Sequence, residues 1–295
     1  MLKDEPLTIA TLLKKFPRPI SLTWLLTLCE TALTALIPLF IGFAIDGLLS
    51  DELNALLRLA AILAGLTAVG VIRRIYDTRV YGTIRVELGK ALVGRADSVP
   101  VSTLNARLCM SRELVDFLET EVPALMSSSV QLVVAVVVLF SFHSTLSYAA
   151  LATAVTMITL YFLFHGRFFR LNADHNHQTE KQVSVLEANS PEGLLSHLNV
   201  LRRIEIRLSD TEAYVYGAIF TVLLGFIIFN LWFASTHIET TVGTIFSIIS
   251  YSWEFVESAL VLPITLQGWS RLSEIMKRIN VRTGGEQSPP TIPCE

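Results

Sequence analysis

Cysteine and charge of either sign are scarce in this sequence, and each shortage excludes a class of protein. The three cysteines, Cys29, Cys109 and Cys294, are an odd number, and Cys29 lies inside an apolar segment, which argues against a disulfide framework. The net charge of −3 comes without a dense basic patch, so the composition does not indicate nucleic-acid binding. The first 19 residues hold no long apolar run, and we therefore expect no cleavable signal peptide.

Apolar residues are what the chain has in excess. Hydrophobic residues make up 52% of the sequence and the mean hydropathy is +0.54, which is too apolar for an ordinary soluble domain. These residues fall into six blocks, each long enough to cross the roughly 30 Å hydrocarbon layer of a membrane. The expected membrane spans are residues 20–48, 56–76, 123–142, 146–164, 213–234 and 242–266.

The connections between these spans alternate in length and in charge. Three are very short, whereas the other two, about 77–122 and 165–212, are long. With Arg73 and Arg74 counted in the first long connection, 22 of the 23 lysines and arginines lie on the termini and the long connections, and only Arg58 does not. Because positively charged segments stay on the cytoplasmic side, we expect both termini and both long connections to be cytoplasmic.

The second long connection, 167–212, is polar and predicts two helical arms. The arms meet at residues 189–192, where Ser190 has the character of an N-cap, Pro191 of a first helical residue and Glu192 of a first-turn acid. Each arm has roughly 22 to 25 residues, so at about 1.5 Å per residue it projects roughly 35 Å from the membrane. We therefore expect a helical hairpin that leaves the bilayer and returns to it.

The first long connection shows a similar pattern. An apolar stripe at helical spacing runs through Val80, Ile84, Leu88 and Leu92, breaks near residues 98–102 and is followed by a returning helical pattern. These arms reach roughly 30–36 Å, which matches the second hairpin. Two helical hairpins of similar length on one side of the membrane are the most specific structural prediction.

A short amphipathic helix precedes the first span. Ile9, Leu12, Leu13 and Phe16 share one helical face, and Pro17 stops the pattern. We interpret this segment as a helix suited to the inner membrane surface. The expected organisation is an amphipathic entry helix (1–19), a six-span transmembrane domain with cytoplasmic extensions (20–282) and a flexible tail (283–295).

Three groups of residues carry a family resemblance. They are Pro38, Gly42, Ile45 and Asp46 in the first span; Arg85, Leu88, Leu92, Val99 and Pro100 after the second; and Gly243, Tyr251, Pro263, Lys277, Arg278 and Ile279 in the last span and exit helix. With six spans and two inner hairpins, this order resembles the transmembrane domain of type-1 ABC exporters over about residues 5–282. The resemblance implies an all-α membrane fold, a homodimer and a translocation pathway at its two-fold axis.

The sequence departs from full-length exporters after the exit helix, where the family has an ATPase domain. No G-x-x-x-x-G-K-S/T phosphate loop occurs in these 295 residues. We therefore expect this chain to be no enzyme and to bind no cofactor itself, with ATP held by a separate ATPase subunit.

Ionisable residues inside membrane spans are costly to bury, which makes each a functional candidate. Glu254 and Glu257 lie about one turn apart in the last span, with Tyr251 and Trp253 nearby. Carboxylates among aromatic rings suit a cationic amphiphile, and the proximity of two carboxylates favours protonation of one. The alternative is that they line a solvated cavity or pair with a polar group across the dimer.

Charged residues in the first two spans favour a structural interpretation. Glu30 and the pair Arg73 and Arg74 lie about equally far from the outer ends of their spans, which favours a structural ion pair over a substrate role. Asp46, near an outer end, is interpreted as a capping or gating residue. His175 and His177 point to different sides of a helix, so we expect no metal site.

The hairpin tips, about 101–107 and 191–199, are the expected contacts with the ATPase. Apolar residues in the second tip favour a docking surface, with packing inside the hairpin as the alternative. The contact candidates are Val101, Ser102, Thr103, Leu104, Arg107, Pro191, Glu192, Leu195, His197 and Leu198.

These features together predict the transmembrane subunit of an ABC-type exporter, embedded in the lipid of the plasma (inner) membrane. Two copies form the pathway, and a separately encoded ATPase drives it by bringing the tips together. Two alternatives stay open. One is a proton-coupled transporter of the same fold that uses Glu254 or Glu257, and the other is a non-transporting membrane scaffold that binds a cytosolic partner through the tips.

Overall fold

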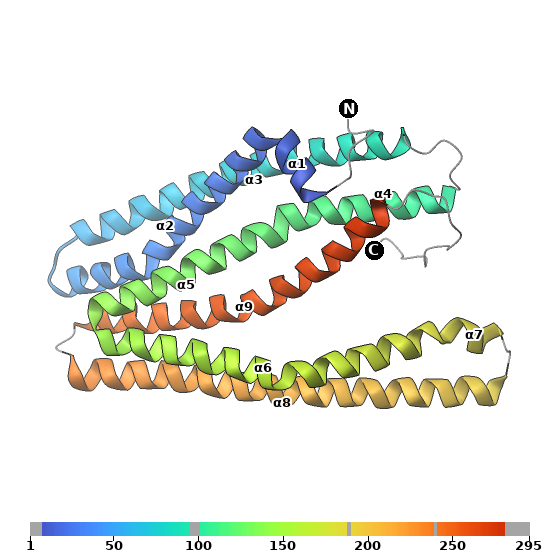
Figure 1. Ribbon diagram of the computed structural model, residues 1–295. Coiled ribbons are helices and arrows are strands. Elements are labelled where there is room, and N and C mark those ends of the chain that lie inside the picture. The colour runs from blue at the N-terminus through green and yellow to red at the C-terminus, as the bar shows by residue number, and fades with distance from the viewer. Residues whose placement is uncertain (1–7, 95–100, 188–189, 239–240, 281–295) are drawn as a thin grey trace. The chain divides into compact units, whose positions relative to one another are not determined.

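The computed structural model describes residues 8–94, 101–187, 190–238 and 241–280, and within these ranges all the regular structure is helical (Figure 1). The chain divides into two compact units. Unit 1 consists of Met1–Val138 with Thr240–Glu295, and unit 2 consists of Leu139–Glu239. The expected all-α class is therefore confirmed for the described residues.

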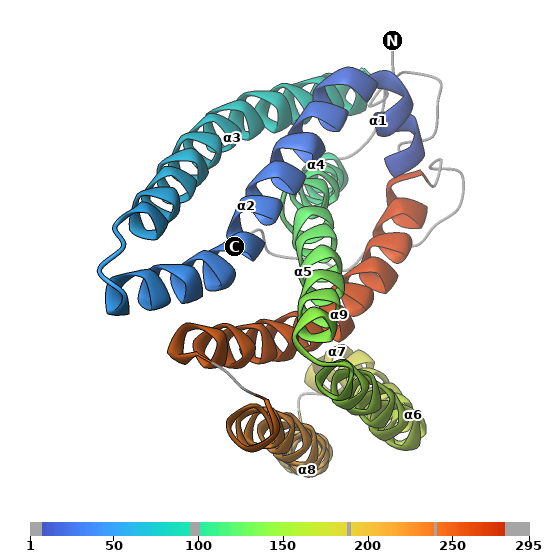
Figure 2. The ribbon, with the colours of Figure 1, turned by 90° about the vertical axis from the view of Figure 1, so that its left-hand side faces the viewer.

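Unit 1 is built around α2, which packs against α3 and against α9 (Figures 1 and 2). The helices α4 and α5 form one continuous rod, joined by the π-helical turn η1. The elements are α1 (Ile9–Lys15), α2 (Pro17–Leu49), α3 (Asn54–Val93), α4 (Val101–Asp116), η1 (Phe117–Glu121), most of α5 (Val122–Phe142) and α9 (Val242–Asn280).

Helix α1 is held by its own cap and by the core of unit 1. The Thr8 side chain accepts a hydrogen bond from the Thr11 amide at 3.2 Å, and the helix ends at Lys15, just before Pro17 opens α2. Leu12 is fully buried in a cluster with side chains of α3 and α4. The apolar face of α1 therefore packs against protein, and its expected place at the inner membrane surface stays a prediction.

The same cluster pairs the two halves of the first long connection. Ile84, Leu88 and Leu92 of the α3 stripe are buried together with Leu114 of α4 and Leu118 of η1. Burial of a large aliphatic side chain contributes about 1.5–3 kcal/mol, and this stripe therefore holds α3 and the α4–η1 segment together.

Unit 2 is an antiparallel helix pair. It contains α6 (Ser144–Glu180), the short α7 (Gln182–Glu187) and α8 (Pro191–His237), and α6 and α8 lie side by side (Figure 1). Helix α8 starts as predicted, because the Ser190 hydroxyl accepts a hydrogen bond from the Gly193 amide at 3.2 Å and Pro191 is the first helical residue.

Five segments of the described chain are long and apolar enough to cross a membrane, and together they include the first five expected spans. The sixth expected span, 242–266, lies on α9, whose side chains are described only as far as Val261, and it stays a prediction. The five segments are Pro17–Leu49, Asn54–Val93, Leu108–Phe142, Ser144–Phe164 and Pro191–His237.

Two further expectations concern the chain ends and the cysteines. Residues 1–7 and 281–295 lie outside the described residues, so the bounds of the entry segment and the tail stay predictions. Cys29 is free and exposed, whereas Cys109 is disulfide-bonded. One bonded cysteine is not a disulfide framework, so the expectation that the chain lacks such a framework stays a prediction.

Candidate functional site

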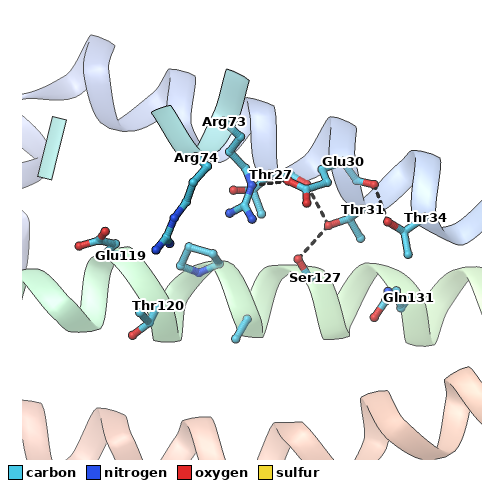
Figure 3. A pocket seen from close by; sticks show the side chains of 12 residues that line it. Thr27, Glu30, Thr31, Thr34, Arg73, Arg74, Glu119, Thr120, Ser127 and Gln131 are labelled. Carbon is cyan, nitrogen blue, oxygen red and sulfur yellow. Dashed lines mark hydrogen bonds and ion pairs between the residues drawn. The ribbon is translucent and has the colours of Figure 1, made fainter. Parts of the chain in front are cut away.

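Polar side chains from three walls of unit 1 surround a pocket of about 360 Å³ (Figure 3). Helix α2 forms one wall, α3 the second, and η1 with the start of α5 the third. The pocket lies between the expected membrane spans, where polar side chains are costly unless they have partners or a ligand. The lining residues are Thr27, Glu30, Thr31, Thr34, Arg73, Arg74, Glu119, Thr120, Pro123, Ala124, Ser127 and Gln131.

An ion-pair network crosses the pocket from α2 to α3. The Arg73 Nε donates to the Glu30 carboxylate, and the Arg73 Nη1 lies 3.5 Å from Oδ2 of Asp77, one turn further along α3. The expected pairing of Glu30 with Arg73 is thus present. Arg74 makes no ion pair or side-chain hydrogen bond to any residue in the described part of the chain.

A second ion-pair cluster fixes the π-helical turn. The Arg85 Nη2 of α3 lies 2.5 Å from Oδ1 of Asp116 and 2.5 Å from Oε2 of Glu119. Glu119 also lines the pocket, so Arg85 holds one pocket wall to α3. Sequence reasoning used Arg85 only as a family motif. The acidic residues three apart at the end of the returning arm were the available signal for its partners.

Hydroxyl groups join the walls where charges do not. The Thr31 and Ser127 hydroxyls lie 2.8 Å apart and link α2 to α5. The Tyr81 hydroxyl lies 3.2 Å from that of Thr23 and donates to the Leu118 carbonyl at 3.0 Å. The pocket therefore has fixed walls on α2, α3 and the η1–α5 segment.

The four candidate residues of the last span lie in different environments. The Glu257 side chain is exposed and accepts a hydrogen bond from the Trp253 indole at 2.7 Å. Glu254 is partly buried, and its Oε2 is buried without a hydrogen-bond partner among the described residues. Tyr251 is fully buried and donates to the Ala35 carbonyl of α2 at 2.7 Å. Tyr251 thus contributes to the packing of α2 against α9. Glu254 is the candidate whose buried carboxylate oxygen has no hydrogen-bond partner among the described residues.

Asp46 joins the end of α2 to the beginning of α9. Its Oδ1 accepts from the Gly243 amide at 2.8 Å, and its Oδ2 accepts from the Thr241 hydroxyl at 2.5 Å. A carboxylate on the first free amides of a helix is a stabilising cap. The structure therefore agrees with the interpretation of Asp46 as a capping residue, and the gating role stays a prediction.

A match to a family model identifies the protein family of this chain. The model of the ABC transporter transmembrane region matches residues 9–243, which is well over half of the chain. The chain belongs to this family. No curated protein matches the sequence. The protein is thus an integral membrane protein of the ABC transporter kind, and such transmembrane domains generally work with ATPase subunits.

The tip of α8 in this ABC transporter transmembrane region is only partly a surface. Leu195 and Leu198 are 66% and 47% exposed, and Pro191 and Glu192 are also exposed. His197 is buried, and its Nδ1 lies 2.9 Å from the Gln178 amide of α6. His197 therefore belongs to the packing inside the pair, whereas the two leucines are exposed.

The other tip of the ABC transporter transmembrane region is described in part. Leu104 of α4 is partly buried. The side chains of Val101, Ser102, Thr103 and Arg107 lie outside the described residues, so their predicted contact role is untested. Among the described residues, no group of three or more histidine, cysteine, aspartate or glutamate side chains is placed to hold a metal ion.

Proposed function

We propose that this protein is the transmembrane subunit of an ABC-type exporter in the plasma (inner) membrane. Two copies form the translocation pathway, and a separately encoded ATPase drives it. The single observation that carries the proposal is the match of residues 9–243 to the ABC transporter transmembrane region. The proposal assigns six spans to each copy and places both termini and both long connections in the cytoplasm.

Helix length supports the cytoplasmic extensions. Helices α3 and α8 have 40 and 47 residues, whereas about 20 residues cross the hydrocarbon layer. At about 1.5 Å per residue, each helix exceeds that layer by roughly 30–40 Å. Basic residues on the excess length, including Arg79, Arg85, Arg202 and Arg203, favour the cytoplasmic side for both.

The proposal assigns ATP hydrolysis to the partner, because these 295 residues hold no loop that could cradle phosphates. The exposed Leu195 and Leu198 give the partner an apolar contact at the tip of α8. Closure of the ATPase on ATP would then move the tips of two copies toward each other and switch the pathway between its two open states.

Charged substitutions at the tip test this proposal. Leu195→Asp with Leu198→Asp is expected to lower recovery of an ATPase subunit, and ATP-dependent transport with it, at least tenfold. Ile206→Asp is the matched control, because Ile206 is on the same helix with the same 47% exposure as Leu198, about 12 Å further from the tip. Purified complexes in detergent supply the first readout, and complexes in sealed proteoliposomes supply the second. Equal losses in the two variants, or wild-type protein that recovers no ATPase, would refute the proposal.

The unpartnered Oε2 of Glu254 favours one alternative, a proton-coupled transporter of the same fold. In that case, Glu254→Gln abolishes transport while Glu257→Gln, at an exposed and already bonded carboxylate, has a small effect. Transport into vesicles that stops with an uncoupler and continues without ATP would favour the alternative. ATP-dependent transport that is insensitive to Glu254→Gln would exclude it.

A further inference from the structure

The π-helical turn η1 (Phe117–Glu121) joins α4 to the wall of the pocket on α5. We propose that η1 is a two-position switch. Its Glu119 carboxylate is held by Arg85 in this structure and by Arg74 in the second position. In the proposed exporter, this exchange connects the tip at the beginning of α4 with the pocket. The exchange itself is a property of this chain, and its tests need no ATPase.

The partner that Glu119 has in this structure is shared. The Arg85 Nη2 lies 2.5 Å from Oδ1 of Asp116 and 2.5 Å from Oε2 of Glu119. Because a guanidinium carries one positive charge, it compensates only one of the two carboxylates, and the two acids repel each other. Water solvates the Asp116 side chain, which is 53% exposed, whereas the Glu119 side chain is only 17% exposed. Glu119 therefore gains more from a cation of its own.

Arg74 is the guanidinium that can take this role. Arg74 and Glu119 line the same pocket, and the Arg74 side chain extends from α3 toward η1 (Figure 3). Arg74 is exposed and makes no ion pair in the described part of the chain, whereas its neighbour Arg73 is held by Glu30 and Asp77. Movement of Glu119 to Arg74 therefore leaves each of the carboxylates in both ion-pair clusters with a guanidinium partner.

The spacing of the two arginines on α3 suits such an exchange. Arg74 and Arg85 are 11 residues apart, which is close to three helical turns, so both lie on one face of α3. The Tyr81 hydroxyl, between them on α3, donates to the Leu118 carbonyl of η1 at 3.0 Å. Leu118 immediately precedes Glu119, so Glu119 lies opposite the stretch of α3 between its two partners.

The π-helical geometry of η1 provides the movement. In a π turn an amide bonds to the carbonyl five residues earlier, as the Val122 amide does to the Phe117 carbonyl, so the turn contains one residue more than an α turn. When the π turn shifts by one residue along the rod, the side chains that it passes rotate by about 100°. Such a rotation moves Glu119 between its partners while the rod stays helical.

Arginine reactivity tests the exchange on the full purified chain in detergent. Phenylglyoxal modifies unpaired arginines faster than paired ones, and peptide mass spectrometry reads Arg74 and Arg79 separately. Arg85→Gln should slow the modification of Arg74 about threefold, because Glu119 then pairs with Arg74. Addition of Glu119→Gln should restore the wild-type rate at Arg74. Arg79 is exposed on the same helix and does not line the pocket, so its rate should stay constant.

Asp116→Asn is the matched control variant, because it also removes one ion pair of the shared cluster but leaves Arg85 to Glu119. In this variant Arg74 should react at the wild-type rate. Three results would overturn the proposal. They are an unchanged rate at Arg74 in Arg85→Gln, protection of Arg74 that survives Glu119→Gln, and equal protection of Arg79.

A second measurement asks whether the chain uses both positions while Arg85 is present. Each shift of the π turn breaks backbone hydrogen bonds of η1 for a moment and exposes its amides to exchange. Arg74→Gln removes the second position, so hydrogen exchange at residues 118–122 should slow about threefold relative to wild type. Arg79→Gln should leave these rates unchanged. Equal rates in the two variants, or faster exchange in Arg74→Gln, would contradict a switch.

Discussion

At the scale of single residues, the beginning of α8 follows local chemistry that the sequence makes visible. Ser190, Pro191 and Glu192 are an N-cap, a first helical residue and a first-turn acid in the sequence, and the structure places each in that role. The cap needs only neighbouring backbone, so no distant contact was required to predict it.

Ser190→Ala should weaken the first turn of α8 by about 1 kcal/mol, because the Gly193 amide loses its acceptor. Hydrogen exchange at residues 192–194 should speed up about fivefold. Ser196→Ala is the control, since Ser196 is exposed inside the same helix. Unchanged protection in the Ser190 variant would show that the cap contributes nothing.

The ion pair of the pocket shows the limit of reasoning at this scale. The similar depths of Glu30 and the α3 arginines in their spans correctly predicted that they pair. Depth alone could not choose between Arg73 and Arg74 as the partner. Adjacent residues on a helix point about 100° apart, so one of them meets Glu30 and the other crosses the pocket. That choice depends on the rotation of α3 about its own axis, which only packing fixes.

At the scale of elements, α2 and α9 are joined by contacts that leave no room for a side chain. A Cβ on Gly243 would lie 2.7 Å from the Asp46 carboxyl group and close to the backbone of Gly42. Further along the same pair, the Ser247 hydroxyl donates to the Pro38 carbonyl at 3.0 Å. Pro38 has no backbone N–H and therefore interrupts the hydrogen bonding inside α2. The Ser247 side chain of α9 bonds to a carbonyl at this interruption.

Gly243→Ala should therefore separate α2 from α9 and lower stability by about 1–3 kcal/mol. A fall in melting temperature in detergent, measured by circular dichroism, is the readout. Gly65→Ala on α3 is the matched control, because nothing lies within 4 Å of its Cβ position, and it should be neutral or stabilising by up to about 1 kcal/mol. Equal melting temperatures for the two variants would contradict the close approach.

Helix α1 shows how an element can be predicted from sequence when its packing partners cannot. The stripe of Ile9, Leu12 and Leu13 correctly predicts the helix, and an apolar stripe suits a lipid surface as well as a protein groove. The structure buries Leu12 among side chains of α3 and α4, and the position of α1 at the membrane stays a prediction. No local pattern in residues 9–16 carries that information.

At the scale of the whole molecule, the orientation in the membrane is the prediction with the widest consequences. Asp51 lies at the short α2–α3 connection and Glu192 at the beginning of α8, which the proposal puts on opposite sides of the membrane. In a cysteine-free background, Asp51→Cys should react with an impermeant maleimide in intact cells. Glu192→Cys should react only after permeabilisation. Labelling of both from the same side would reverse or remove the proposed topology.

The sequence alone determined the properties that depend on composition, period and charge. These are the helical class, the five apolar segments found in the described chain, and the cap of α8, because hydrophobic runs and N-caps act within a few residues. Tertiary structure decided the contacts between distant segments, namely the packing of Leu12 of α1, the Asp46 cap on α9 and the choice of Arg73 as the partner of Glu30. Those outcomes depend on how each helix is rotated and packed against its neighbours, and side chains from all of them fix that rotation together.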